Sequence, residues 1–170
     1  MAIEIRPYRP EDAEVTADIF RRAILEVSIR DYTPAEALAW ADVMQDHAAW
    51  AARRASRPTW IAMVAGRAAG FSDLTKDGLL DMMFVHPDFQ RIGVASALLA
   101  VVEAEAIRQG HARIHTEASR TSQPFFARRG FRVLSQGNAS VRGETLENYR
   151  MEKALLRPEP LGTQPTQAVL

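Results

Sequence analysis

The chain of 170 residues contains no cysteine. That absence excludes structural disulfides, metal sites built on thiolates and any acyl-enzyme formed on a cysteine of this chain. Lysine is scarce as well, since Lys76 and Lys153 are the only two and all other basic side chains apart from histidine are arginine. Such a bias is typical of a GC-rich genome, and it also suits fixed contacts with anions.

A net charge and long apolar runs are also missing. Lysine plus arginine and aspartate plus glutamate number 21 each, so the formal net charge is zero. No whole-molecule field therefore attracts nucleic acid or an anionic membrane. No stretch reaches the roughly 18 apolar residues of a membrane span, and the N-terminus carries no apolar signal-peptide core. We expect a cytoplasmic protein with no nucleic acid and no membrane as partner.

The composition is that of an ordinary globular domain. Hydrophobic residues make up 47% of the chain and charged residues 25%. This length is enough to bury one core and is cramped for two. Residues 157–170 contain three prolines and a glycine. We therefore expect one domain over residues 1–156, followed by a flexible tail over residues 157–170.

Alternation and helical periodicity predict the elements of this domain. Residues 3–8 are expected to form a strand, and a helix follows Glu11. Thr33 and Pro34 are typical of a helix start and open a second helix through about Arg54. The remaining pattern predicts strands at 59–64, 68–74, 79–85, 113–117, 131–135 and 146–153, and helices at 92–109 and 123–129. The fold class is α/β, a single mixed sheet of six to seven strands, with an antiparallel meander followed by a parallel β-α-β crossover.

The segment Gln90 to Ala95 joins a strand to the longest predicted helix through one glycine, Gly93. The free N–H groups of a helix start and the helix dipole together favour an anion, so this segment is a candidate pyrophosphate site made of backbone. The alternative is a plain strand-to-helix turn. A P-loop and a dinucleotide fingerprint are both excluded, because their further glycines and lysine are absent.

Two segments carry a family resemblance: "LLDMMFVHPDFQRIGVASALL", around Gly93, and "PFFARRGF", Pro124 to Phe131. The first resembles the acyl-CoA signature of the GNAT superfamily of N-acetyltransferases, and the second resembles that family's F-Y-x-x-x-G-F segment, in the same order. With "DYTPAEALAWA" and "HTEAS", the chain is most similar to the YafP-like branch, which suggests a bacterial source. The resemblance implies acetyl-CoA as co-substrate, a small-molecule amine as acceptor, direct attack in a ternary complex and no metal.

The resemblance also implies cofactor-binding residues. The signature would hold the CoA pyrophosphate by its backbone, and the preceding strand would run alongside the pantetheine where the sheet splays open. A bulge there would let a strand N–H near Phe84 or Val85 polarise the thioester carbonyl. The expected set is Met83, Phe84, Val85, Gln90, Arg91, Ile92, Gly93, Val94, Ala95, Ser96, Ser122 and Phe125. For the strand residues the alternative is an ordinary core strand.

The chain departs from the family at Phe126, which occupies the position of the tyrosine that often donates the proton to the departing thiolate. A phenyl ring has no proton to give. Candidates for the role are Tyr149 first, then Tyr32, Ser119 and Ser122, unless the thiolate leaves unassisted. The same departure motivates a second hypothesis, a non-catalytic acyl-CoA sensor. A third hypothesis, a partner-binding domain without a CoA site, rests on the proline-containing tail.

Asp81 is the leading candidate for the base that deprotonates the amine. It is a single acid in an apolar strand, where burial would raise its pKa and require a partner. A structural, ion-paired aspartate is the alternative. Glu117 and His115 share one face of the next strand and could lie in the same cleft as Asp81. We therefore predict Asp81, Glu117 and Tyr149 as the catalytic residues.

Aromatic residues gather on the second predicted helix and the strand after it: Tyr32, Trp40, Trp50 and Trp60. In the family that this chain resembles, the first two helices wall the acceptor site. Tyr32 and Trp40 are therefore predicted to line a pocket for a flat or apolar amine, with core packing as the alternative. Arg53, Arg54 and Arg57 are expected to form a solvated helix end. A homodimer is possible.

Overall fold

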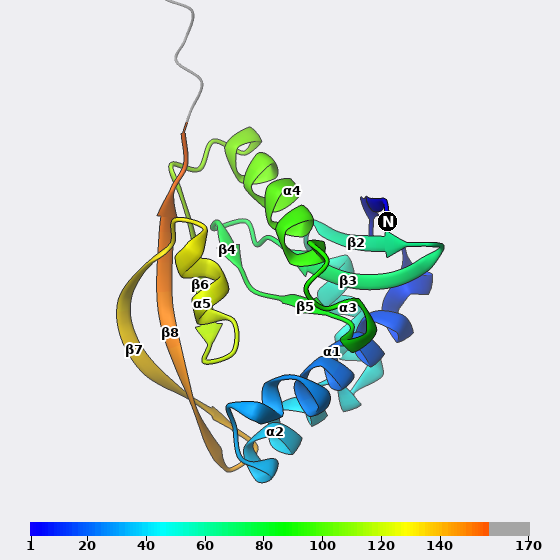
Figure 1. The fold of residues 1–170 in the computed structure, drawn as a ribbon, viewed down its shortest axis with the longest axis vertical. Coiled ribbons are helices and arrows are strands. Elements are labelled where there is room, and N and C mark those ends of the chain that lie inside the picture. Colours follow the sequence, from blue (N-terminus) through cyan, green and yellow to red (C-terminus); the bar gives the residue numbers. More distant parts are fainter. Residues whose placement is uncertain (157–170) are drawn as a thin grey trace, which may run out of the picture.

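A computed structural model describes residues 1–156 of the chain, so the predicted tail lies outside the described residues. Strand β1 (Ile3–Pro7) is followed by helices α1 (Ala13–Glu26), α2 (Pro34–Ala41) and α3 (His47–Ala55) (Figure 1). Thr33 caps α2 together with Glu36, as the Thr-Pro start predicts. The prediction of one helix through Arg54 is wrong. A 3-10 turn, Asp42–Gln45, interrupts it, and Asp46 caps a new helix by accepting from Ala49 N at 3.0 Å.

The strands form two four-stranded sheets in the described residues. The first has the order β1-β2-β3-β5 and is antiparallel throughout, with β2 (Thr59–Val64), β3 (Arg67–Asp73) and β5 (Met83–Val85). The second has the order β4-β6-β8-β7, with β4 (Leu79–Leu80), β6 (Arg113–Ser119), β7 (Arg132–Val141) and β8 (Glu144–Ala154). The predicted α/β class is confirmed, while the expected single sheet is divided in two.

The division falls inside the strand predicted at 79–85. Leu79 and Leu80 pair in parallel with β6, whereas Met83 to Val85 pair with β3. Between them, Asp73 Oδ1 accepts from the backbone N–H groups of Asp81, at 3.1 Å, and Met82, at 2.7 Å. A side-chain carboxylate thus takes the place of a backbone carbonyl in the ladder, and the chain passes from one sheet to the other at this point.

The predicted crossover is present, since α5 (Gln123–Arg128) joins β6 to β7. Helix α4 (Val94–Arg108) joins β5, in the first sheet, to β6, in the second. Strands β6 and β7 run parallel, because each is antiparallel to β8, which lies between them. Strand β7 extends six residues beyond its predicted end at Ser135, to Val141, since the hairpin turn lies at Arg142 and Gly143, both with positive φ.

Helix α4 packs across both sheets (Figure 1). Val94 and Leu98 are buried against β2 and β3, while Leu99 and Val102 are buried against β4, β6 and α5. A Cβ at Gly70 would stand 2.8 Å from Phe84 O and 2.9 Å from Val94 Cγ1. Glycine is therefore required there for the start of α4 to approach β3 and β5. Helices α1 to α3 contribute to a separate core on the first sheet, around Phe20 and Phe71.

Within residues 1–156, no helix combines the length and the apolar character that crossing a membrane requires.

Candidate active site

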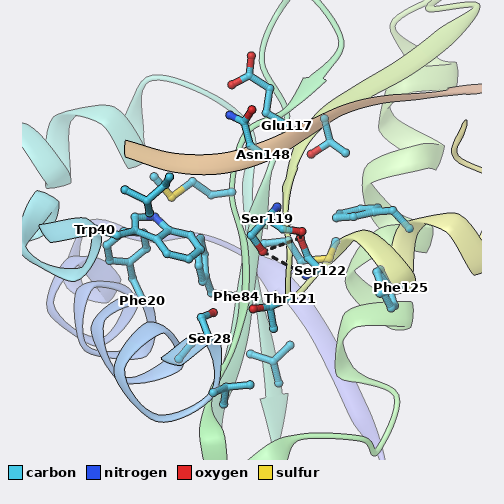
Figure 2. Close-up of a pocket in the computed structure, with 18 of the residues that line it drawn as sticks. Phe20, Ser28, Trp40, Phe84, Glu117, Ser119, Thr121, Ser122, Phe125 and Asn148 are labelled. Atoms are coloured by element: carbon cyan, nitrogen blue, oxygen red, sulfur yellow. Dashed lines mark hydrogen bonds between the residues drawn. The ribbon is translucent and has the colours of Figure 1, made fainter. Parts of the chain in front are cut away.

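A cavity of about 380 Å³ is lined by residues on both sides of the place where the two sheets separate. Its lining comes from α1 and α2 on one side, β5 and the start of α4 in the middle, and β6, α5, β7 and β8 on the other. Figure 2 shows Phe20, Trp40 and Phe84 grouped together, Phe125 across from them, and Ser119 and Ser122 between. The site is thus assembled from segments spread over most of the described chain.

Strand β5 presents to this cavity an edge that pairs with no other strand of the described residues. His86 N donates to Ala69 O at 2.8 Å and Asp73 N donates to Met82 O at 3.1 Å. Hydrogen-bonded pairs recur at every second residue of an antiparallel ladder, so Phe84 and Phe71 form such a pair and the Phe84 N–H faces β3. The N–H groups of the residues on either side, Met83 and Val85, face away from β3. Of the two expected alternatives, Phe84 and Val85, the register leaves only the Val85 N–H available.

The loop after β5 turns into α4 through Gly93, which has φ 99°. Space for a Cβ exists there, with only Ile3 Cδ1 within 4 Å at 3.7 Å, so the left-handed conformation is what requires glycine. The first turn of α4 contains no acidic residue and receives no side-chain cap. The backbone N–H groups at Val94 and Ala95 are left without helical partners and suit a phosphate.

Other members of the predicted cofactor set surround this loop. Gln90 lines the cavity and its side-chain amide donates to Val85 O at 2.8 Å. Arg129 donates to the Ser96 hydroxyl and lies over the Phe125 ring at 4.1 Å. Met83, Phe84, Val85, Ala95, Ser122 and Phe125 also line the cavity; Arg91, Ile92, Gly93, Val94 and Ser96 do not. The residues and backbone groups present fit an acyl-CoA whose pyrophosphate would lie outside the cavity.

Asp81 lines the cavity but is exposed, with 36% of its side chain accessible, and is ion-paired with Arg57 at 2.9 Å. The expected burial of Asp81 is wrong. The buried acid is Asp73, which is ion-paired at 2.9 Å with a fully buried Arg54, so the expectation of a solvated Arg54 is also wrong. Periodicity could not show this, because a charged residue at the end of a helix is usually exposed.

Glu117 also lines the cavity, and no hydrogen bond or ion pair of its side chain is found within residues 1–156. Asp81 and Glu117 therefore share a cleft, as expected. His115 does not line it and instead faces a separate depression beside Arg57 and Lys76. Among the described residues, no three His, Asp or Glu side chains gather as metal ligands would.

The tyrosines considered as acids are engaged elsewhere. Tyr149 does not line the cavity, so its expected inward orientation is not observed; its hydroxyl donates to Glu147 Oε1 at 2.6 Å. Tyr32 is buried at the cavity wall, where its hydroxyl donates to Glu147 O at 2.8 Å and accepts from Arg120 N at 2.9 Å. Burial raises the pKa of Tyr32, which further weakens it as an acid.

Glu147 lines the cavity and stays ionised. Hydrogen bonds from Arg120 and Tyr149 lower the pKa of its carboxyl to about 2. At neutral pH such a group carries charge but exchanges no proton.

Ser119 and Ser122 lie at the centre of the cavity (Figure 2). Their hydroxyls are 3.0 Å apart, and each accepts from the other's backbone N–H, at 3.0 and 3.1 Å. One hydroxyl proton serves the contact between them. The second proton has only a long 3.5 Å contact, from Ser122 Oγ to Ser119 O, and is free for a ligand.

Aromatic rings cover the cavity wall formed by the helices and β5. Trp40 meets Phe20, Tyr32 and Phe84 edge to face, with centroids 6.5, 5.6 and 5.9 Å apart. Tyr32 and Trp40 therefore reach the cavity, as predicted, while Trp50 is core and donates to Thr16 Oγ1 at 3.0 Å. Phe20 was not predicted, because its position on α1 has ordinary core spacing.

A split sheet with an open strand edge, beside a helix that begins at a glycine, is the arrangement expected of an acyltransferase that uses acyl-CoA. The comparisons with known proteins agree. A protein-family model described as an acetyltransferase (GNAT) domain matches residues 28–155 of the chain. The chain belongs to the GNAT family of acetyltransferases, as the two motifs indicate, and it is an acetyl-CoA-dependent acyltransferase by that membership.

Three relatives illustrate the likeness. The chain is 33% identical to a protein of Escherichia coli (strain K12) described as the uncharacterized N-acetyltransferase YafP, over 88% of this chain and 94% of that one. A GCN5-related N-acetyltransferase structure from Rhodopseudomonas palustris is 36% identical, with a TM-score of 0.89 over 91% and 97% of the two chains. The PaiA N-acetyltransferase from Thermoplasma acidophilum, solved with coenzyme A, is 19% identical with a TM-score of 0.74 over 91% and 99%, which shows the shared fold.

Proposed function

We propose that the protein transfers the acetyl group of acetyl-CoA directly to the amine of a small molecule, with both substrates bound together. The observation that carries this proposal is the open edge of β5, which meets a cavity lined by an unpartnered carboxylate, Glu117, and two serine hydroxyls. Acetyl-CoA supplies the activated acetyl thioester. The chain supplies binding, orientation and proton transfer.

The donor is held by backbone in this proposal. The pyrophosphate lies at the start of α4, where Gly93 allows close approach and Arg91 and Arg129 add positive charge without any ion pair to a carboxylate in the described residues. The pantetheine runs along the edge of β5. The Val85 N–H, which points away from β3, donates to the thioester carbonyl and stabilises the negative charge that develops there.

Glu117 acts as the base. Of the three lining acids, Asp81 is neutralised by Arg57 and Glu147 by Arg120, so Glu117 alone is left to accept a proton from the incoming ammonium, directly or through one water. Asp81 then takes no part in proton transfer and affects only the electrostatic potential of the cleft. The hydroxyl pair of Ser119 and Ser122 passes a proton to the departing thiolate and recovers one from the attacking nitrogen, which must lose that proton for the amide to form. Phe126, 3% exposed, has no proton to pass.

The test follows free thiol released from acetyl-CoA with a panel of amines and each amide product by mass. Glu117→Gln should lower kcat about 100-fold, because general-base catalysis of this kind contributes 10²–10⁴-fold, while acetyl-CoA affinity stays within about two-fold. Glu4→Gln, an exposed strand glutamate on β1, is the control and should behave as wild type. Wild-type kcat in Glu117→Gln would remove Glu117 from the mechanism.

A second function is favoured by Phe126, namely an acyl-CoA sensor without turnover. It predicts acetyl-CoA binding by calorimetry and no thiol release with any amine. Failure to bind acetyl-CoA at all would contradict both functions and support a partner-binding domain instead.

A further inference from the structure

The cavity wall formed by the helices and β5 carries aromatic rings, and the charged side chains that line the cavity are all acidic. Building on the proposed acetyl transfer, we infer that the acceptor is an arylalkylamine: a flat aromatic body that carries an ammonium group and no carboxylate or phosphate.

The aromatic part of the argument rests on four rings. Phe20, Tyr32, Trp40 and Phe84 form a continuous wall, with Phe20 and Phe84 centroids 4.8 Å apart. All four line the cavity, and Trp40 contacts each of the other three rings. Figure 2 shows Trp40 beside Phe20 and Phe84. A flat aromatic ligand can add one more edge-to-face or offset contact to such a wall, which an aliphatic chain of equal area cannot.

The charge part rests on the lining residues. Asp81, Glu117 and Glu147 are the charged side chains that line the cavity, and within residues 1–156 no lysine, arginine or histidine lines it. Arg57 and Arg120 form ion pairs with two of these acids without lining the cavity themselves, and Arg120 lies 5.6 Å from the centroid of the Tyr32 ring. An ammonium therefore finds a carboxylate and aromatic faces, whereas a carboxylate would enter without a cation to pair with.

Strand β5 connects the rings to the reaction. Side chains alternate along a strand, and Phe84 packs with the α1 to α3 core while Met83 and Val85 pack on the α4 side. An aromatic acceptor that packs against the Phe84 ring therefore lies beside the next residue, Val85, whose N–H is proposed to donate to the thioester carbonyl. The cavity of about 380 Å³ must also admit the acetyl end of the donor, so the acceptor is small.

Matched pairs of acceptors test this inference: 2-phenylethylamine against phenylalanine, and tryptamine against tryptophan. Each pair differs by one carboxylate. Hexylamine is the aliphatic control. We expect kcat/KM for each arylalkylamine to exceed kcat/KM for hexylamine about ten-fold. We expect it to exceed kcat/KM for the matching amino acid at least about 100-fold. Both ratios correspond to the free energy of a single desolvated contact. Equal use of amine and amino acid would overturn the inference, as would a peptide N-terminus used better than any arylalkylamine.

Variants locate the effect. Trp40→Ala should raise KM for 2-phenylethylamine about ten-fold with KM for acetyl-CoA unchanged, while Leu38→Ala, exposed on the same helix, should change neither. Asn148→Lys, which adds a cation to the lining, should allow phenylalanine to be acetylated. An unchanged KM in Trp40→Ala, with the variant folded by circular dichroism, would contradict the inference.

Calorimetry separates this inference from the proposed function. Titration of 2-phenylethylamine and hexylamine into the protein with CoA tests the acceptor class without turnover. Tighter binding of 2-phenylethylamine with no acetylation would contradict the proposed catalysis and support the acceptor class. Acetylation of amines with no preference for aromatic ones would support the proposed catalysis and contradict the acceptor class.

Discussion

The donor half and the acceptor half of the candidate site are built in different ways. The donor half is mostly backbone: the edge of β5, the turn at Gly93 and the first N–H groups of α4, all within residues 83–96. The acceptor half is mostly side chains, contributed by α1, α2, β5, β6 and β8. A backbone site can serve one constant ligand in many relatives, whereas side chains can be exchanged to suit a different acceptor.

The buried pair of Arg54 and Asp73 lies outside the cavity lining and holds the point where the sheets separate. Arg54→Met should lower the free energy of unfolding by about 3–5 kcal/mol, because it removes the 2.9 Å ion pair of the buried Asp73 and leaves only the longer one to Arg57, at 3.6 Å. Urea unfolding measures the loss. Arg53→Met, the exposed neighbour, is the control and should stay within about 0.5 kcal/mol. Equal stabilities would show that the pair does not hold the split.

Gly93 tests the donor half alone. Gly93→Val should weaken acetyl-CoA binding about 100-fold, since a β-branched residue resists φ 99° and withdraws the N–H groups from the phosphates. Gly66→Val, at φ 75° in the β2–β3 turn with open space around it, imposes a similar backbone strain away from the site. Calorimetry should find wild-type affinity in Gly66→Val. If both variants lost affinity equally, general destabilisation would be the cause.

The smallest effects concern the proton donor. Ser122→Ala should lower kcat about ten-fold, because it removes one of the two hydroxyls in the cavity. Tyr149→Phe should lower kcat less than about three-fold, because the Tyr149 hydroxyl acts only on Glu147, which Arg120 still holds ionised. Steady-state kinetics with a saturating amine compares the two. A larger loss in Tyr149→Phe would return Tyr149 to the role of acid.

Most of the fold could be predicted from periodicity and turn residues, because these depend on neighbours in the chain. The Thr33 cap and the glycine that begins α4 are of this kind. The break at Asp81 and Met82 could not be predicted, since the residue that causes it, Asp73, is eight residues away and an aspartate at a strand end is usually solvated. The burial of Arg54 could not be predicted either, because its partner Asp73 is 19 residues away along the chain.

The sequence by itself determined the family and the donor half, because the signature around Gly93 and the segment ending at Phe131 encode local backbone geometry. Only the tertiary structure decided the acceptor half. It brought Phe20 beside Trp40 and Phe84, kept Tyr149 outside the cavity, and left Glu117 as the lining acid without a partner among the described residues. The physical reason is that side-chain contacts between distant segments depend on how two sheets separate and pack, which no local pattern records.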